Sequence, residues 1–582
     1  MTSPDDTYAL LGAFVDELAR CGMRAACTSP GSRCAPLVLS LANEPRIRCF
    51  SHVDERCAGF FALGHAKASG LPVAVACTSG TAAAELMPSV IEAREARAPM
   101  IVLTADRPPE LRDVGAGQTI DQLKLYGAAA KWFVEVGLER CDPPRLRWLR
   151  TLACRAYWTA LECRPGVVHL NFPLCEPLVC DGQPPPAGGG RPAGAPYLVR
   201  STAPRDHAAA SPLAALVDAS RRALVVAGRH ERPPAPGSAP PGEVTARMCA
   251  QLGWPLLADP LSGARRGEAA IAHYDALLRD EAFAASVTPD LVLRIGDLPV
   301  SKPLRTWLAA LPDAAQVAID PEGAWQDPAG VLSHSLALDP GAALALALDA
   351  VSAVQEGWLQ SWRSADARGA EAILGALAGE QLSEPVIARE LGVLLPSQAT
   401  LFVASSMPVR EIESFWPARA DPPRVLCNRG ASGIDGTVSS AFGAAAACAG
   451  PVVLLIGDVA LAHDIGGLLA ASRLGLKLTI VLVDNAGGGI FDFLPVARAP
   501  MAREGDVYTD HVATPTGLDF ARAADLYGLA HESVRDVFEL REALERALAA
   551  PGPCIVHART ERGANVALHE RVWSAVARAL SA

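Results

Sequence analysis

The chain has 582 residues, of which 50% are hydrophobic and 20% are charged, and its formal net charge is −11. A chain of this length exceeds what one hydrophobic core organises, so we expect about three globular domains. The acidic balance leaves no basic surplus to neutralise phosphates, which argues against a nucleic-acid partner or an anionic membrane surface. An anionic substrate would have to be held by a local cluster of arginines.

Cysteine usage and the first residues of the chain indicate a compartment. Fifteen cysteines are spread along the sequence without a CxxC pair. We therefore predict neither a zinc site nor a disulfide framework, but reduced thiols in the cytoplasm. Residues 1–7 are acidic and lack a basic segment followed by an apolar one, so no signal peptide is expected.

Residues 436–457 carry no charge, but their serines, glycines and proline favour a buried small-residue helix over a membrane span.

The first third of the chain alternates between predicted strands and helices. Runs at residues 47–50, 72–77 and 100–106 are predicted to form strands, and the second and third are mostly apolar, as is typical of buried parallel strands. After the first run, His52-Val-Asp-Glu55-Arg56 precedes an alanine-rich helix. Acidic residues favour a helix N-terminus through its dipole, so this segment needs no functional explanation by itself. The second run leads into Thr78-Ser-Gly-Thr81 and a small-residue helix.

Proline and glycine mark the middle of the chain. Residues 181–204 include the sequence PPPAGGG, which neither a helix nor a central strand tolerates, so they are predicted to form a linker. A strand is predicted at 223–228, and the proline-rich stretch 232–242 after it is expected to be a surface loop of the next domain. A further boundary is expected at 371–384, before a strand pattern begins at 401–404.

The last third repeats the plan of the first. Apolar runs at 451–456 and 478–483 predict two buried parallel strands, and residues 465–474 between them have helical spacing. The spacing of these strands is close to that of the predicted strands at 72–77 and 100–106. Both ends of the chain are therefore expected to form doubly wound α/β domains.

Oxygen-bearing side chains follow both strands of this C-terminal pair. Gly457-Asp458-Val459 ends the first strand, and Asp484-Asn485-Ala486-Gly487 ends the second, at the sheet edge where open α/β folds bind ligands. The Asp458 carboxylate, the Asn485 amide oxygen and a backbone carbonyl near Gly487 suit Mg²⁺, which prefers oxygen ligands and usually completes its shell with waters and phosphates. A strand-end aspartate that caps the next helix and an asparagine turn explain the same residues about equally well.

Gly457-Asp458 followed by Asn485 resembles the metal-binding motif of thiamine diphosphate enzymes. Val459 and Asp484 depart from that motif, which usually has glycine and asparagine there, but neither is one of the proposed ligands. The resemblance implies an α/β fold with three doubly wound domains and mainly parallel sheets. These are a pyrimidine-binding domain at 1–182, a linker at 183–204, a middle domain at 205–372, and a diphosphate- and metal-binding domain at 373–582.

Further segments narrow the resemblance to one family. They are Thr28-Ser-Pro-Gly-Ser-Arg33, Asp54-Glu-Arg56, Thr78-Ser-Gly-Thr81, Thr104-Ala-Asp-Arg-Pro-Pro-Glu-Leu-Arg112, Gln118, Ser405-Ser-Met-Pro-Val-Arg410, Asn428-Arg-Gly-Ala-Ser-Gly-Ile-Asp-Gly436 and Gly488-Gly-Ile-Phe491. Together they resemble the 2-succinyl-5-enolpyruvyl-6-hydroxy-3-cyclohexene-1-carboxylate synthases of menaquinone biosynthesis. That family decarboxylates 2-oxoglutarate and adds the succinyl unit to isochorismate. It uses thiamine diphosphate and Mg²⁺ or Mn²⁺, and the resemblance implies a homodimer or homotetramer with active sites at the subunit interface.

The resemblance also assigns roles to residues. A buried glutamate that contacts the pyrimidine ring of the cofactor is required for its activation, and both substrates are dianions that need bidentate arginine partners. The implied catalytic residues are Glu55, Arg33, Arg107 and Gln118. The implied cofactor-binding residues are Glu55, Thr78, Ser406, Met407, Ile434, Gly457, Asp458, Val459 and Asn485. The implied substrate-binding residues are Ser32, Arg33, Arg107, Gln118, Lys302, Arg410, Arg429, Ile490 and Phe491. The metal ligands are Asp458, Asn485 and the Gly487 carbonyl.

Two alternatives remain open at this point. Another thiamine diphosphate enzyme, such as an acetohydroxyacid synthase or a 2-oxoacid decarboxylase, explains Glu55 and Asp458 but not the arginines within the motifs. A catalytically silent sensor that keeps the fold for binding has no need of Glu55. For each arginine taken singly, a surface or salt-bridge role is the competing interpretation, and for Ile434, Ile490 and Phe491 it is core packing.

Overall fold

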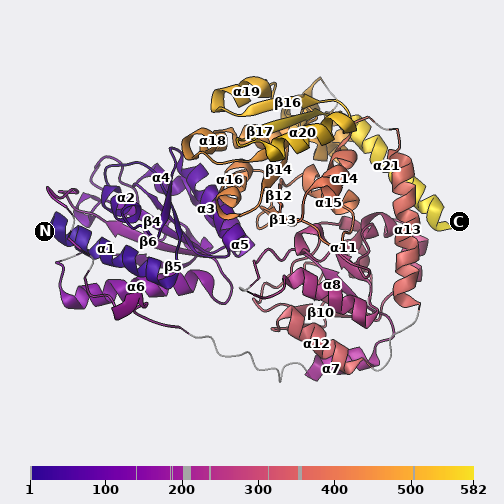
Figure 1. The fold of residues 1–582 in the computed structure, drawn as a ribbon, viewed down its shortest axis with the longest axis horizontal. Coiled ribbons are helices and arrows are strands. Elements are labelled where there is room, and N and C mark those ends of the chain that lie inside the picture. The colour runs from indigo at the N-terminus through magenta and orange to yellow at the C-terminus, as the bar shows by residue number, and fades with distance from the viewer. Residues whose placement is uncertain are drawn as a thin grey trace. The chain divides into compact units, whose positions relative to one another are not determined.

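The computed structural model describes residues 3–138, 140–183, 185–186, 188–200, 211–234, 237–311, 313–351, 357–379, 381–502 and 505–581 (Figure 1). The chain divides into two compact units. Unit 1 consists of Met1–Ala203, Asn428–Ala449 and His463–Lys477, and unit 2 of Pro204–Cys427, Gly450–Ala462 and Leu478–Ala582. The described residues form three β-sheets, and every strand pairing in them is parallel.

Unit 1 contains a six-stranded sheet with the order β2-β1-β3-β4-β6-β5. Its central strands are buried along their whole length, as expected for apolar runs covered by helices on both faces. The strands are β1 (Ala25–Thr28), β2 (Arg48–Ser51), β3 (Val73–Cys77), β4 (Met100–Asp106), β5 (Ala130–Glu135) and β6 (Val167–Pro173). The three strands predicted in this part of the chain are confirmed to within about a residue.

Capped amphipathic helices cover this sheet. α1 (Pro4–Cys21) begins at the Ser3 cap, which accepts a hydrogen bond from the Asp6 N–H at 3.1 Å, and it ends at Gly22 in the left-handed conformation. Its apolar side packs with α6 (Pro143–Leu161) into one core with the sheet. Other described helices of unit 1 are α2 (Ala35–Ala42), α3 (Glu55–Ser69), α4 (Thr81–Glu85), α5 (Met87–Ala96) and α18 (Leu469–Leu474).

Small residues bring α3 and α16 (Thr437–Ala447) into close contact within unit 1. A Cβ atom on Gly64 would lie 1.9 Å from the Ser440 carbonyl oxygen, and one on Gly443 would lie 2.0 Å from the Phe61 carbonyl oxygen. The Ser440 hydroxyl donates to the Phe60 carbonyl at 3.0 Å. Only glycine permits this approach, and the prediction of a buried small-residue helix here is confirmed.

Unit 2 contains the other two sheets. The five-stranded sheet has the order β11-β10-β9-β7-β8, with β7 (Ala223–Ala227), β8 (Leu256–Ala258), β9 (Leu291–Ile295), β10 (Ala315–Ile319) and β11 (His334–Leu336). The six-stranded sheet has the order β13-β12-β14-β15-β17-β16, with β12 (Thr400–Val403), β13 (Arg424–Cys427), β14 (Val452–Gly457), β15 (Thr479–Asp484), β16 (Ala530–Val534) and β17 (Cys554–Arg559). When the strands of each six-stranded sheet are numbered along the chain, this sheet and the sheet of unit 1 have the same strand order.

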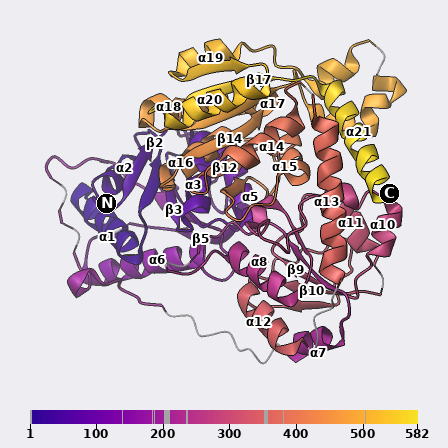
Figure 2. The ribbon, with the colours of Figure 1, turned by 45° about the vertical axis from the view of Figure 1, so that its right-hand side comes forward.

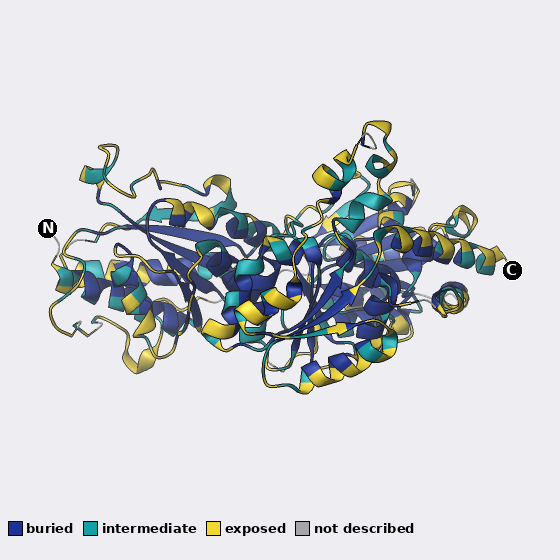
Figure 3. Cartoon of the chain, turned by 90° about the horizontal axis from the view of Figure 1, so that it is seen from above, coloured by how far each residue is buried: buried dark blue, intermediate teal, exposed yellow. Residues whose placement is uncertain are grey.

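Helices flank both sheets of unit 2 (Figure 2). They include α7 (Ser211–Ala219), α8 (Pro241–Leu252), α11 (Lys302–Ala309), α12 (Pro340–Ala350), α13 (Trp358–Leu377), α14 (Glu384–Leu394), α15 (Met407–Phe415), α17 (Asp458–His463), α19 (Phe520–Tyr527), α20 (Val537–Ala549) and α21 (Arg562–Ser581). The central strands are buried, and exposed residues lie mainly on helices, on loops and on edge strands such as β2 and β16 (Figure 3). The prediction of an α/β fold built on parallel sheets is confirmed.

The predicted domain limits stay a prediction. Each sheet lies within one of the three predicted ranges, and the limit between residues 372 and 373 falls inside α13. Of the predicted linker, residues 184, 187 and 201–204 lie outside the described residues, and the rest contains one short 3-10 turn, Pro192–Gly194.

All fifteen cysteines belong to the described residues and are free thiols. The described helices include none with the length and apolar character needed to cross a bilayer.

Candidate active site

Glu55 is the first residue of α3, four residues after β2 ends at Ser51. Asp54 caps the helix, because its side chain accepts a hydrogen bond from the Cys57 N–H at 3.2 Å. Glu55 is half-buried, and burial raises the pKa of its carboxyl, with further contributions from the charges of Asp54 and Glu85. Such a carboxyl can hold a proton and share it with a nitrogen of a bound ring.

Other predicted residues lie at the same edge of the unit 1 sheet. Thr78 follows β3 and packs on Gly31, where a Cβ atom would lie 2.4 Å from the Thr78 Cβ. Burial, and secondarily the charge of Glu55, raises the pKa of the Cys34 thiol to about 11. Arg33 follows β1 and Glu55 follows its parallel neighbour β2, so both residues lie at the same edge of the sheet.

Arginine side chains gather beside this edge. Arg33 is 6% exposed and donates to the Glu176 carboxylate at 2.9 Å, while its Nε is buried without a hydrogen-bond partner among the described residues. Arg107 donates to the Ser79 hydroxyl, which in turn donates to the Gln118 carbonyl at 2.9 Å. Burial and then the charge of Arg33 lower the pKa of Arg107. Two arginines that repel each other are suited to a shared anionic partner; Ser32, beside them, is exposed.

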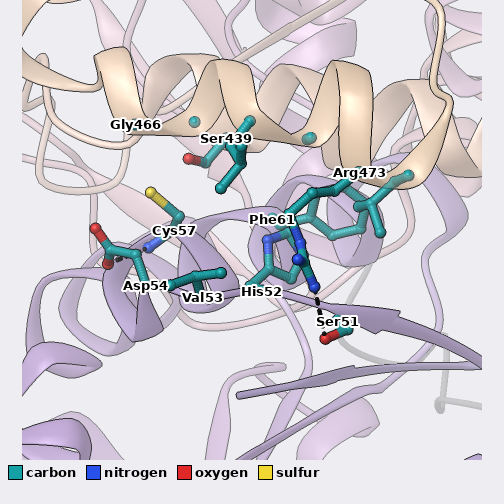
Figure 4. A pocket seen from close by; sticks show the side chains of 13 residues that line it. Ser51, His52, Val53, Asp54, Cys57, Phe61, Ser439, Gly466 and Arg473 are labelled. Atoms are coloured by element: carbon teal, nitrogen blue, oxygen red, sulfur yellow. Dashed lines mark hydrogen bonds between the residues drawn. The ribbon is translucent and has the colours of Figure 1, made fainter. Parts of the chain in front are cut away.

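A small cavity lies beside the start of α3 (Figure 4). It encloses about 20 Å³, and its wall includes Ser51, His52, Asp54, Cys57, Ser439 and Arg473. Burial lowers the pKa of His52 to about 4, so its ring is neutral at pH 7. The cavity has room for about one water molecule, and it is too small for a cofactor.

Glu92 of α5 holds the loop that carries Arg429 and Ile434. Its carboxylate accepts hydrogen bonds from the Gly430 N–H at 2.8 Å and the Ala431 N–H at 2.6 Å. Both Arg429 and Ile434 are half-buried on this loop, which belongs to unit 1. No local pattern in the sequence pointed to Glu92, because it contacts residues more than 300 positions away.

Asp458 and the Gly487 turn come together in unit 2. Asp458 is 2% exposed, and its Oδ2 accepts a hydrogen bond from the Gly487 N–H at 2.9 Å. Burial, and then the nearby charge of Asp484, raises the pKa of Asp458 to about 6. Gly487 has a φ of 137°, and its carbonyl accepts from the Gly489 N–H at 2.9 Å, which leaves one lone pair of that oxygen.

Asn485 completes the predicted metal-ligand set. Its Nδ2 donates to the Glu384 carboxylate at 2.7 Å, and its Oδ1 is buried with no hydrogen-bond partner among the described residues. Asp484, the departure from the family motif, accepts from the Ala486 N–H at 3.2 Å and contacts the His557 Nε2 at 3.1 Å. Asp484 therefore shapes the turn, and neither it nor the half-buried Val459 takes the place of a proposed ligand.

These residues fit a divalent cation. A buried carboxylate and an orphaned buried amide oxygen both cost free energy in the absence of a partner. A hard cation such as Mg²⁺ would satisfy both atoms and the free lone pair of the Gly487 carbonyl. Burial, and then the charge of Glu411, raises the pKa of the neighbouring Glu384 to about 7, so the negative charge of this buried group is unfavourable and a nearby cation would stabilise it.

The diphosphate and substrate residues of unit 2 lie on separate elements. Ser406 has a φ of 71° and precedes α15, whose first residue, Met407, is buried. Arg410, one turn on, donates to the Ser406 carbonyl at 2.5 Å. Ile490 and Phe491 lie in the short helix Gly489–Phe493 that follows the Gly487 turn. Lys302 is exposed at the first position of α11, and no contact in the described residues joins it to the others.

The predicted residues thus form two groups. Unit 1 holds Ser32, Arg33, Glu55, Thr78, Arg107, Gln118, Arg429 and Ile434, and unit 2 holds Lys302, Ser406, Met407, Arg410, Gly457, Asp458, Val459, Asn485, Gly487, Ile490 and Phe491. Sequence reasoning missed Glu384 and Glu92, which contact members of these groups from distant parts of the chain.

Comparison with known proteins gives consistent results. Family models described as "Thiamine pyrophosphate enzyme, N-terminal TPP binding domain", "Middle domain of thiamine pyrophosphate" and "Thiamine pyrophosphate enzyme, C-terminal TPP binding domain" match residues 10–125, 195–403 and 410–558. Proteins named 2-succinyl-5-enolpyruvyl-6-hydroxy-3-cyclohexene-1-carboxylate synthase are similar over nearly the whole chain. One from Geobacillus kaustophilus is 42% identical, with 98% of each chain covered. One from Chloroflexus aurantiacus is 42% identical, with 98% of this chain and 96% of that protein covered, and one from Listeria monocytogenes is 39% identical, with 98% of each covered.

Proposed function

Because the chain belongs to the 2-succinyl-5-enolpyruvyl-6-hydroxy-3-cyclohexene-1-carboxylate synthase family of thiamine pyrophosphate enzymes, we propose that it catalyses the reaction of that name. It decarboxylates 2-oxoglutarate and adds the succinyl unit to isochorismate in menaquinone biosynthesis. The observation that supports this substrate pair is the position of Arg33 and Arg107 at the sheet edge that also carries Glu55. Arg107 directly follows β4, and Arg33 donates to the Leu174 carbonyl just after the neighbouring strand β6. Dianionic substrates need such fixed cations.

Thiamine diphosphate and a divalent cation are the cofactors in this proposal. When bound, thiamine diphosphate supplies a carbon nucleophile and a sink for the charge left when CO₂ departs. Asp458, Asn485 and the Gly487 carbonyl would hold the Mg²⁺ or Mn²⁺, with Gly457 and Val459 beside the diphosphate. The backbone around Ser406 and Met407 at the start of α15 would bind phosphate oxygens. Thr78 and Ile434 would contact the rings.

Glu55 carries the proton-transfer role. Burial raises the pKa of its carboxyl, and so it can hold or accept a proton at a ring nitrogen of the cofactor. It lies at the first position of α3, where the Asp54 cap fixes the start of the helix. The carboxyl is therefore presented at a defined place on the sheet edge.

The arginines bind and orient the substrates. Arg33, Arg107 and Gln118, with Ser32 beside them, bind carboxylates from unit 1. The further substrate contacts come from Lys302, Arg410, Arg429, Ile490 and Phe491. In this assignment the charged residues fix the carboxylates, and Ile490 and Phe491 pack on the isochorismate ring and exclude water from the reacting atoms.

We also propose the domain roles, the assembly and the compartment. Residues 1–182 bind the pyrimidine end, 205–372 form the middle domain after the 183–204 linker, and 373–582 bind diphosphate and metal. Glu55 and Asp458 lie in different units, and the proposed cofactor site needs both residues. A homodimer or homotetramer with active sites between subunits completes it. Fifteen free thiols suit the reducing cytoplasm.

A decarboxylation assay tests the reaction. The purified chain is supplied with thiamine diphosphate and Mg²⁺, and CO₂ release is measured from 2-oxoglutarate and from pyruvate, each with and without isochorismate. We expect CO₂ release from 2-oxoglutarate, with the coupled product detected by mass when isochorismate is present. Turnover of pyruvate with no response to 2-oxoglutarate would reject the proposal.

A further inference from the structure

The side-chain amide of Asn485 poses an orientation problem for a metal ligand. Its oxygen and its NH₂ group sit on the same carbon, and only the oxygen can bind a cation. A rotation of the amide by half a turn would direct the NH₂ group at the metal. An asparagine ligand therefore needs a partner that accepts from its nitrogen.

Glu384 is that partner in the structure. Its Oε1 accepts a hydrogen bond from the Asn485 Nδ2 at 2.7 Å, the length of a charge-assisted bond. The structure directs the amide nitrogen at Glu384, and the ionised carboxylate can accept from this nitrogen but has no proton to donate to the amide oxygen. The Asn485 Oδ1 is left buried and unpartnered among the described residues, on the ligand side of the amide.

The position of Glu384 is more costly than a helix start requires. It is the first residue of α14, where an acidic side chain is favoured by the helix dipole. A solvent-exposed carboxylate would give that benefit, but Glu384 is only 4% exposed. Its other side-chain contact, from the Thr560 hydroxyl at 3.4 Å, is longer than the bond to Asn485. Burial of this carboxylate is thus offset chiefly by the Asn485 amide.

We propose that Glu384 is a positioning residue for the metal site: it fixes the Asn485 amide so that the oxygen, not the nitrogen, faces the divalent cation. This inference rests on the proposed function, which places that cation at Asp458 and Asn485. Glu384 does not touch the cation, the cofactor or the substrates. It acts through Asn485, from a position 101 residues earlier in the chain.

Mn²⁺ binding tests the inference directly. The affinity of the full chain for Mn²⁺ is measured by electron paramagnetic resonance of free Mn²⁺ in the presence of thiamine diphosphate. We expect Glu384→Ala to weaken Mn²⁺ binding by about tenfold or more, the size typical of partners that orient metal ligands. Glu384→Gln keeps the shape of the side chain and one acceptor oxygen, so it should lose less Mn²⁺ affinity than Glu384→Ala. Activity lost in either variant should return at high Mn²⁺ concentration.

A second buried glutamate of the same helix gives a matched control. Glu390 of α14 is 3% exposed and accepts from the Arg541 Nε at 2.7 Å, not from Asn485. Glu390→Ala should lower thermal stability while Mn²⁺ affinity stays at the wild-type value. An equal loss of Mn²⁺ affinity in Glu390→Ala and Glu384→Ala would overturn the inference, because it would reduce the effect to general destabilisation.

A double substitution separates orientation from stability. Aspartate at position 485 has two equivalent oxygens, so it needs no partner to choose between them. In an Asn485→Asp background, Glu384→Gln should no longer weaken Mn²⁺ binding, because the Gln amide can donate to the new carboxylate. If both Glu384→Ala and Glu384→Gln bind Mn²⁺ with wild-type affinity, the inference about Glu384 is overturned, but the proposed function is not. A wild-type chain that binds no Mn²⁺ with thiamine diphosphate would instead overturn the proposed function.

Discussion

The sheet of unit 1 and the second six-stranded sheet of unit 2 have the same strand order, yet their carboxyl edges carry different chemistry. In unit 1, β4 ends at Asp106, which is fully buried and accepts from the Asn171 Nδ2 of β6 at 2.9 Å. In unit 2, β15 ends at Asp484, which contacts the His557 Nε2 of β17 at 3.1 Å. Asn171 and His557 hold equivalent register positions, two residues before the partner of the strand-end aspartate.

The two edges differ in where their positive charge comes from. Asp106 is neutralised within the chain, because Arg112 forms an ion pair with it at 3.0 Å. At the start of the helix after β14, Asp458 is buried with the Gly487 N–H as a partner, and the neighbouring Asn485 oxygen has none in the described residues. A repeated fold can thus supply cations at one edge and require an external cation at the other. In the proposed function, the first edge binds anions and the second a metal.

The largest expected effect comes from Glu55→Gln at the unit 1 edge. The substitution keeps the shape but removes the group that exchanges a proton, so we expect turnover to fall about a thousandfold, within the range typical of general acid–base groups. Mn²⁺ binding at the unit 2 edge should be unchanged, as measured in the same preparation. Full turnover in Glu55→Gln would reject the role of Glu55, and lost Mn²⁺ binding would erase the distinction between the edges.

As the pH falls, we expect unit 1 to lose stability at a higher pH than unit 2. In unit 1, burial lowers the pKa of His65 in α3 to about 4 and that of His169 in β6 to about 3. A lowered pKa means that the unfolded chain binds the proton more tightly, so stability is complete above pH 6.5 and is lost as the pH falls toward 4. One such histidine accounts for up to about 3 kcal/mol.

Hydrogen exchange measured by mass spectrometry from pH 7 to pH 4 follows the two units separately. We expect protection of peptides from α3 to fall first, and His65→Gln to reduce that loss. Earlier exposure of α21 would contradict this difference between the units.

The smallest expected difference separates two matched substitutions at the strand ends. In Asp106→Asn, the new NH₂ group meets Asn171, whose Oδ1 already accepts from Thr104 at 2.7 Å and Gln122 at 2.9 Å, so its amide cannot turn. We expect a loss of about 1–3 kcal/mol in the free energy of unfolding. Asp484→Asn should cost less than about 1 kcal/mol, because the ring of His557 can change tautomer and accept.

Denaturant unfolding of both variants measures this difference. Equal losses would show that the two edges hold their strand ends in the same way. A greater loss in Asp484→Asn would reverse the comparison.

The sequence predicted those parts of the fold that depend on local pattern. The strands at 72–77, 451–456 and 478–483 were found because continuous apolar runs mark strands buried on both faces. Asp458 and Asn485 were found because each follows such a run. Their interpretation as a metal site needed the family resemblance, since a capping aspartate and an asparagine turn have the same local pattern.

The rest depends on contacts between distant segments. Glu384 lies 101 residues from Asn485, and at the start of a helix it has the pattern of an ordinary first-turn acid. Glu92 contacts a loop more than 300 residues later. The grouping of residues 428–449 with unit 1 depends on how closely Gly64 and Gly443 let two helices approach, which no periodicity reveals.

The proposed difference between the two sheet edges is tested most directly by a crystal structure with thiamine diphosphate and Mn²⁺, in which anomalous scattering locates the metal. We expect one Mn²⁺ site with oxygen ligands from Asp458, Asn485 and the Gly487 carbonyl, and the Asn485 nitrogen directed at Glu384. The Glu55 carboxylate should contact the pyrimidine ring and have no metal. Mn²⁺ bound at the unit 1 edge, or coordinated without Asp458 and Asn485, would contradict the proposed difference.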